Sequence, residues 1–161
     1  MRAHLGLGSN EGGRLEALRL ARAALERRAV RVTAASSVYE TAPQGEVLDQ
    51  ADFLNACLAV DVDVSPEDLL DTCKAVEREL GRELSGVRHG PRPIDVDVLL
   101  FDELHHESER LLLPHPGVRT RRFVLEPLLE LDPAMKLPDG TELAGLLEGV
   151  LDQRVRRVGS L

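Results

Sequence analysis

The segment 94–101 constrains the fold of this chain most, because it alternates apolar side chains with two carboxylates and then becomes wholly apolar. Successive side chains of an extended strand point to opposite faces of a sheet. Asp95 and Asp97 are therefore expected on one face, and the apolar side chains at positions 94, 96 and 98 on the other. The pattern predicts a buried strand with a charged site at one end.

The two carboxylates suggest a metal site. On a strand, Asp95 and Asp97 lie roughly 6 to 7 Å apart at the backbone, and carboxylates that close resist joint ionisation. A hard divalent cation usually offsets this repulsion, and Mg²⁺ is the commonest one that also binds phosphates. Arg88 and Arg92, just upstream, suit phosphate oxygens. Spacing alone also allows two solvated acids on a surface strand, or an Asp–Arg pair that caps an edge.

Length and cysteine content indicate one cytoplasmic domain. With 161 residues, the chain fits a single domain over residues 1–161 that can bury a sizeable core. Cys57 and Cys73 fall in apolar-periodic segments, so we expect small buried hydrophobes rather than a disulfide or metal pair. The N-terminus lacks the basic start and apolar core of a secretion signal, and no stretch approaches membrane-spanning length.

The charge of the chain argues for a small anionic ligand. A net charge of −8 disfavours nucleic acids and acidic membranes as partners, because phosphate backbones reward a basic surface. Within residues 82–122 the arginines balance the acids, and a cation on Asp95 and Asp97 would make this segment locally positive. We therefore expect small-molecule substrates rather than a nucleic acid or a membrane. We also expect no obligate protein partner.

The order of expected elements indicates the fold class. A strand over 3–7 and a glycine-rich stretch over 6–13, taken as a structural tight turn, precede a helix over 15–29. Strands over 30–39 and 53–64 follow, then a helix from Ser65 and Pro66 to about Leu80, and the strand of Asp95. Short helices over 123–131 and 143–151 and a strand over 154–158 complete the chain. The order β-α-β-β-α-β predicts an α+β fold: a single-domain, ferredoxin-like α/β sandwich with an antiparallel-rich sheet and short C-terminal additions.

Several short motifs occur together in a characteristic order. They are Gly6-Leu7-Gly8-Ser9-Asn10, Ser36-Ser37-Val38-Tyr39-Glu40-Thr41, Asp52-Phe53-Leu54-Asn55-Ala56, Gly90-Pro91-Arg92-Pro93-Ile94-Asp95-Val96-Asp97, and Pro114-His115-Pro116 followed by Arg121-Arg122-Phe123-Val124-Leu125. Over almost its whole length the chain resembles 6-hydroxymethyl-7,8-dihydropterin pyrophosphokinase of folate biosynthesis. The resemblance implies transfer of the β,γ-diphosphate of ATP to the pterin's hydroxymethyl oxygen, leaving AMP. It also implies two Mg²⁺ ions between two aspartates and the phosphates of ATP, the co-substrate.

The resemblance also assigns roles to residues. It puts the metals on Asp95 and Asp97. The catalytic set is Arg82, Arg92, Asp95, Asp97 and Arg121. The set expected to bind ATP is Glu77, Arg88, Arg92, Arg110, His115 and Arg121. The set expected at the pterin is Thr41, Ala42, Pro43 and Asn55 at its edge, with Phe53 and Phe123 on its two faces.

Other readings of some residues are simpler. Arg119 and Arg122 are expected as solvated surface residues, and Tyr39 and Phe101 as core. Asn55 is expected to have a hydrogen-bond partner, because a buried amide without one is costly.

The chain departs from the family pattern in one loop and beside His115. Leu84 and Ser85 stand where well-known members carry basic residues, and His89 replaces a common tryptophan. Leu112 and Pro116 stand where some members have threonine and tyrosine. Arg82 and Arg88 must then act without those basic neighbours.

Two other functions compete with this hypothesis. One is a different Mg-dependent phosphoryl or nucleotidyl transferase on a ferredoxin-like core, because paired aspartates on a sheet serve those reactions too. The other is a small regulatory module that binds a ligand without chemistry.

Overall fold

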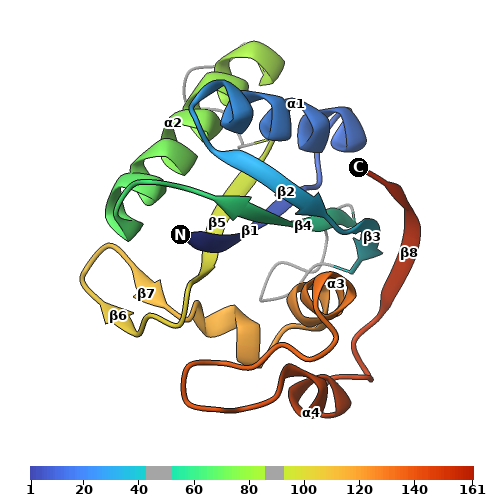
Figure 1. Ribbon diagram of the computed structural model, residues 1–161. Coiled ribbons are helices and arrows are strands. Elements are labelled where there is room, and N and C mark those ends of the chain that lie inside the picture. The colour runs from blue at the N-terminus through green and yellow to red at the C-terminus, as the bar shows by residue number, and fades with distance from the viewer. Residues whose placement is uncertain (43–51, 86–92) are drawn as a thin grey trace.

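The computed structural model describes residues 1–42, 52–85 and 93–161, without the side chains of 82–85. Its elements are β1 (Arg2–Ser9), α1 (Arg14–Arg27), β2 (Arg31–Ala35), β3 (Ser37–Thr41), β4 (Phe53–Asp61), α2 (Pro66–Ser85), β5 (Asp95–Phe101), β6 (His106–Glu107), β7 (Leu112–Leu113), the 3-10 helix η1 (Pro116–Arg119), α3 (Arg122–Leu131), α4 (Leu143–Glu148) and β8 (Val155–Ser160) (Figure 1). None of the described helices is both long and apolar enough to cross a membrane.

Six strands form the main sheet, in the order β5-β1-β4-β3-β8, with β2 also paired to β4. All of these pairs are antiparallel. The predicted strand 30–39 is divided into β2 and β3 at Ser36. There the Ser36 N–H donates to the Cys57 carbonyl and the Ser36 hydroxyl accepts from the Cys57 N–H, both at 2.9 Å. The expected ferredoxin-like, antiparallel-rich fold is confirmed.

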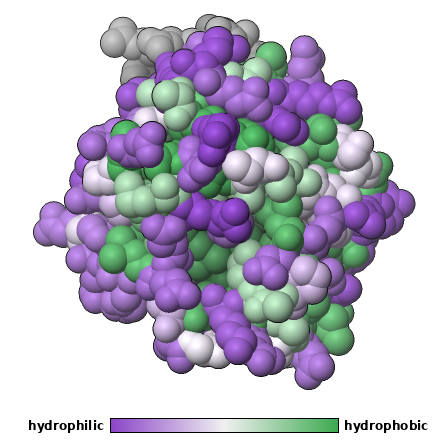
Figure 2. Space-filling model, viewed as in Figure 1, coloured by the Kyte–Doolittle hydropathy of each residue, from purple (hydrophilic) through white to green (hydrophobic). Residues whose placement is uncertain are grey.

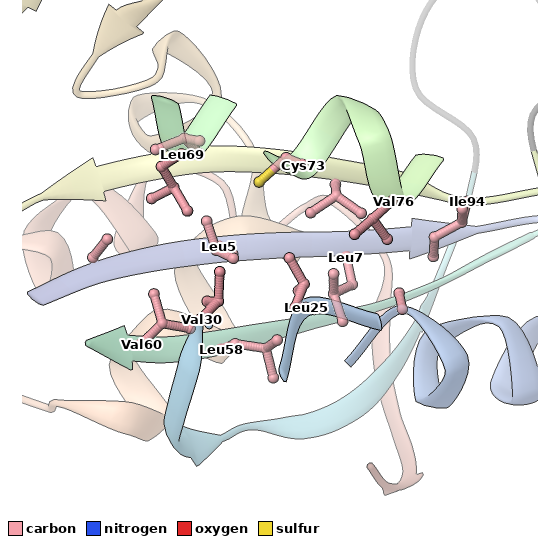
Figure 3. Packing of buried hydrophobic residues seen from close by; sticks show 14 of the residues in the cluster. Leu5, Leu7, Leu25, Val30, Leu58, Val60, Leu69, Cys73, Val76 and Ile94 are labelled. Carbon is pink, nitrogen blue, oxygen red and sulfur yellow. The ribbon is translucent and has the colours of Figure 1, made fainter. Parts of the chain in front are cut away.

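Helices α1 and α2 cover one face of the sheet (Figure 1). Figure 3 shows Leu5 and Leu7 of β1 packed between Leu58 of β4 and the side chains of α2, Cys73 among them. Val96 of β5 belongs to the same cluster, as the alternation in its strand predicts. Burying these apolar side chains contributes roughly 1.5–3 kcal/mol each and drives the sheet and helices together.

Both cysteines are free and buried, so their expected role as small hydrophobes is confirmed. Burial raises the pKa of the Cys73 thiol to about 12, and nearby Glu77 and Asp97 add to the shift. Burial likewise raises the pKa of Cys57, with a further contribution from Asp97. Neither thiol therefore ionises near neutral pH.

The C-terminal additions build a second layer on the other face of the sheet. Leu125 and Leu128 of α3 and Leu143 of α4 form a second buried cluster with Leu99 of β5. In the orientation of Figure 1, the surface is mostly hydrophilic, with apolar side chains gathered near its centre (Figure 2). This second layer brings α3 and η1 over the sheet face that carries the aspartates.

Helix α2 is longer than predicted. It runs from Pro66 to Ser85 through Gly81, so the expected end near Leu80 was wrong. The beginning is as expected, since the Ser65 hydroxyl accepts from the Asp68 N–H at 3.2 Å. A glycine costs only about 1 kcal/mol inside a helix, and packing of a long amphipathic helix on the sheet outweighs that.

Ala29 should be a site at which glycine stabilises the fold. It follows α1 with φ 63°, and the Val30 N–H closes the helix on the Leu25 carbonyl at 3.1 Å. This left-handed conformation costs a residue with a Cβ about 1–2 kcal/mol, whereas glycine adopts it freely. We expect Ala29→Gly to raise the free energy of unfolding in urea by about 0.5–1 kcal/mol, after the greater chain entropy of the unfolded state is subtracted.

Ala23→Gly is the matched control, because Ala23 lies inside α1. Glycine there should lower the free energy of unfolding by about 1 kcal/mol. Equal losses in both variants would show that the backbone at Ala29 is not strained.

Candidate active site

A cleft opens between the sheet and the segment that leads into α3. Its empty volume is about 790 Å³, including space open to solvent. The residues that line it come from β1, β3, β4, β5 and the stretch after β7. They are Gly6, Leu7, Gly8, Thr41, Ala42, Phe53, Asn55, Ala56, Cys57, Asp95, Asp97, Leu99, His115, Arg121, Phe123 and Val124.

Two glycines of β1 form the floor of the cleft. Gly6 lies opposite Asp97 in the strand register, and Gly8 lies between Asp95 and Asn55. A Cβ on Gly8 would stand 2.9 Å from the Asn55 Oδ1, closer than real Cβ contacts. The Asn55 amide therefore occupies the space that a side chain at position 8 would need. Glycine within a strand often marks such close approaches.

The glycine-rich motif differs from its prediction. Gly6, Gly8 and Ser9 belong to β1 itself rather than to a tight turn, and only the residues after Ser9 turn toward α1. The alternation of a strand can continue through small residues, so the sequence does not show that the strand ends only at Ser9. The spacing of two glycines on one strand face was the signal that could have identified the cleft floor.

Asp95 and Asp97 lie together on the cleft side of β5, as the alternation predicts. Asp95 is exposed and Asp97 half-buried, whereas Val96 between them is fully buried on the helix side. Among the residues the structure describes, no cluster of three or more His, Cys, Asp or Glu side chains could hold a metal ion. Two carboxylates alone fit Mg²⁺, because this ion commonly takes one or two carboxylates and completes its octahedron with phosphates and water.

His115 faces the carboxylates from the start of η1. Its Nδ1 accepts from the Gly117 N–H at 2.9 Å, so the neutral ring carries its proton on Nε2. Burial lowers the pKa of His115, Asp97 opposes that shift, and Arg121 reinforces it. A neutral imidazole can donate from Nε2 to an anionic oxygen.

Arg121 and Phe123 stand side by side at the start of α3. The Arg121 guanidinium carbon lies 5.7 Å from the centre of the Phe123 ring, within cation–π range. A Cβ on Gly117 would lie 3.1 Å from the His115 Nδ1 and 3.2 Å from the Arg121 Cδ. The absence of a side chain at Gly117 allows this close approach of the two basic groups.

The other end of the cleft is aromatic and amide-lined. Phe53 of β4 and Phe123 both line it, with Thr41 and Ala42 at the end of β3. Asn55 is 7% exposed, and its Nδ2 donates to the Thr41 Oγ1 at 2.8 Å. The expectation that this buried amide has a partner is confirmed. The structure thus brings together the cleft residues expected at a pterin and those expected at phosphates.

Two residues expected at ATP lie outside the cleft lining. Glu77 is buried against the edge strand β5, where its carboxylate accepts from the Val96 N–H at 2.9 Å and pairs with Lys74. Arg110 pairs with Asp71 of α2. ATP binding by Glu77 and Arg110 stays a prediction. Other expected site residues are outside the described part of the chain: Pro43, Arg88, Arg92 and the side chain of Arg82. Of the departures from the family pattern, His89 and the side chains of Leu84 and Ser85 are outside it too.

Most of the purely structural interpretations given to individual residues are confirmed. Tyr39 and Phe101 are buried, as expected of core residues. Arg119 is an exposed side chain, paired with Asp139 at 2.6 Å. Arg122, in contrast, is not a solvated surface residue. Its guanidinium donates to the carbonyls of residues 151 and 153 at 2.8 Å and pairs with residue 126, because these oxygens follow α4 and lie beside α3.

Comparison with known proteins identifies the family. The sequence profile of 7,8-dihydro-6-hydroxymethylpterin-pyrophosphokinase (HPPK) matches residues 4–133. The 2-amino-4-hydroxy-6-hydroxymethyldihydropteridine pyrophosphokinase of Bacillus subtilis is 46% identical over 130 residues, which are 80% of this chain and 77% of that protein. The Methylorubrum extorquens protein of the same name is 47% identical over 136 residues, 82% of this chain and 83% of that one.

Longer proteins contain the same unit. The mitochondrial folate synthesis bifunctional protein of Arabidopsis thaliana is 41% identical over 79% of this chain, and the match spans 23% of the plant protein's length. A crystal structure of Plasmodium falciparum HPPK-DHPS superposes with a TM-score of 0.71 at 16% identity, covering 92% of this chain and 45% of that one. That likeness supports the fold. The resemblance seen in the sequence motifs is confirmed, and the chain belongs to the 7,8-dihydro-6-hydroxymethylpterin-pyrophosphokinase family.

Proposed function

We propose that this chain transfers the β,γ-diphosphate of ATP to the hydroxymethyl group of 6-hydroxymethyl-7,8-dihydropterin, giving the pterin diphosphate and AMP. The observation that carries the proposal is one cleft that joins paired aspartates to two phenylalanines and a buried amide, in a chain of this family. The two bacterial relatives are named as this pyrophosphokinase, and this chain matches most of the length of each.

The aromatic end of the cleft suits a pterin. A flat bicyclic ring needs two apolar faces and hydrogen-bonding groups at its edge. Phe53 and Phe123 supply the faces, and Asn55 with the main chain of Thr41 and Ala42 supplies the edge. The bond between Asn55 and Thr41 fixes the amide before the ligand arrives, which lowers the cost of ordering it.

The charged end suits the triphosphate. Asp95 and Asp97 would hold Mg²⁺, in two ions, against the phosphate oxygens. When bound, such ions neutralise charge on the transferring group and favour ionisation of the hydroxymethyl oxygen. His115 donates from Nε2, and the Arg121 guanidinium neutralises developing charge on the phosphates. Arg82, Arg88 and Arg92 are expected to add to this positive charge.

The proposed reaction needs only small molecules and a metal ion. ATP is the co-substrate and Mg²⁺ the cofactor, and the products are small molecules. We expect the enzyme to act in the cytoplasm without an obligate protein partner.

The test is analysis of products from ATP and the pterin alcohol, with and without Mg²⁺. We expect AMP and pterin diphosphate in equal amounts, and loss of both when the metal is chelated. A pterin with a methyl group in place of hydroxymethyl is the control and should give no AMP. Formation of ADP, or release of free pyrophosphate, would contradict the proposal and favour another phosphoryl or nucleotidyl transferase.

A further inference from the structure

The connection between β3 and β4 does not by itself fix the pterin end of the cleft. The two strands pair at three positions, from Tyr39–Asn55 to Thr41–Phe53. The chain that joins them, residues 42–52, is far longer than the two-residue turn that sets hairpin register. Thr41–Phe53 is the last pair of this ladder, so a contact beside it can hold the end of the ladder closed where it lines the cleft.

Arg14, the first residue of α1, bridges the two strand ends. Its Nη2 donates to the Glu40 Oε2 at 3.0 Å, and its Nη1 donates to the Asp52 carbonyl oxygen at 2.8 Å. Glu40 immediately precedes Thr41, and Asp52 immediately precedes Phe53. A single guanidinium thus joins the residues that immediately precede Thr41 and Phe53, both of which line the cleft.

The bridge is of a kind that only arginine makes well. The side chains of Arg14 and Glu40 are 30% and 22% exposed, so solvent screens their pairing only in part. Arg156 of β8 lowers the pKa of Glu40 most and Arg14 adds to the shift, so Glu40 is ionised at neutral pH. A planar fork can serve a carboxylate and a carbonyl at once, whereas a lysine ammonium lacks that geometry.

Glu40 has a second cationic partner that provides a comparison. Arg156 donates to the Glu40 Oε1 at 2.8 Å, but its side chain is 73% exposed. Exposed pairs contribute little. Of the two strands, the Arg156 side chain bonds to β3 alone, so it does not join the end of β3 to that of β4.

We propose that Arg14 is a positioning residue for the pterin. By joining Glu40 to the Asp52 carbonyl, it keeps the end of the β3–β4 ladder from fraying, where Thr41 meets Asn55 and Phe53 flanks the ring. Arg14 does not line the cleft, so its effect reaches the ligand through β3 and β4. This inference rests on the proposed function, because the ligand concerned is the pterin.

Calorimetry of 6-hydroxymethylpterin binding to the full chain, with Mg²⁺ and a saturating non-hydrolysable ATP analogue, tests the inference. We expect Arg14→Ala to raise the Kd of the pterin about tenfold, because small displacements of positioning groups have large effects. The Kd of the ATP analogue should change by less than about twofold. Arg14→Lys should raise the pterin Kd about threefold, since the ammonium keeps the pairing with Glu40 but loses the fork.

Two controls separate positioning from general stability. Arg156→Ala removes the other ion pair of Glu40 and should leave the pterin Kd within about twofold. Arg22→Ala removes an exposed pair on the same helix and should leave it unchanged. Glu40→Gln should weaken pterin binding. In the Arg14→Ala background it should add nothing, because Arg14→Ala already removes both bonds of the bridge, the one to Glu40 included.

The pterin affinities of these variants support or overturn the inference. Pterin affinity in Arg14→Ala equal to that in Arg156→Ala would overturn the inference, whatever happens to the melting temperature. If Arg14→Ala fails to fold, Arg14→Lys decides in the same way. Failure of the unmodified chain to bind the pterin would overturn the proposed function and the inference with it, whereas binding that ignores Arg14 overturns the inference alone.

Discussion

Replacing Asp97 by alanine is expected to lower kcat for AMP formation about a thousandfold. The metal-held phosphates would lose one of two carboxylate anchors, and charge stabilisation of several kcal/mol in the transition state corresponds to a factor of that size. Asp97 lies half-buried on the cleft side of β5, opposite Gly6, and its side chain contributes nothing to the apolar cluster on the other face. Its loss should therefore affect chemistry far more than folding.

The measurement is steady-state AMP formation at saturating ATP, pterin and Mg²⁺, with the urea unfolding midpoint as the folding check. Asp63→Asn, at an exposed acid after β4, is the control and should keep full activity. A folded Asp97→Ala variant with near-normal turnover would indicate a binding module or a different metal site.

Replacing Phe123 by alanine is expected to weaken pterin binding about thirtyfold. The variant loses one stacking face and its apolar area, worth roughly 2 kcal/mol, and no charge. Phe123 lies at the start of α3 and lines the cleft, and Arg121 stands over its ring. The ATP analogue should bind within about fivefold of normal, because an exposed cation–π contact contributes only about 0.5–1 kcal/mol.

Calorimetry with each ligand separates these effects. Phe123→Tyr keeps the ring and should keep most of the pterin affinity. Equal losses for pterin and nucleotide in Phe123→Ala would show that the ring does not stack on the pterin.

Much of the fold could be predicted from periodicity. Alternation in segment 94–101 placed Asp95 and Asp97 on one face and Val96 on the other, and the cap at Ser65 marked the beginning of α2. These are local signals. The break at Ser36 was not predictable, because a hydroxyl there replaces a main-chain acceptor only when Cys57 is its neighbour across the sheet.

In the candidate site, the positions of short side chains could be predicted from the sequence better than those of long ones. The side chains of aspartate, asparagine and phenylalanine are short or rigid, so the face of the strand or helix that carries them determines where they lie. An arginine reaches several ångströms and pairs with whatever acid the tertiary fold supplies. Arg110 therefore lies against Asp71, and Arg122 against the carbonyls after α4, although neither partner is signalled by sequence spacing.

The central claim is that Asp95 and Asp97 jointly hold divalent cations beneath the phosphates of ATP. A crystal grown with Mn²⁺ and a non-hydrolysable ATP analogue tests it most directly, through the anomalous signal of the metal. We expect peaks within about 2.0–2.3 Å of oxygens from both carboxylates and from the phosphates. A bound nucleotide with no peak at these aspartates, or with their carboxylates turned apart, would contradict the account.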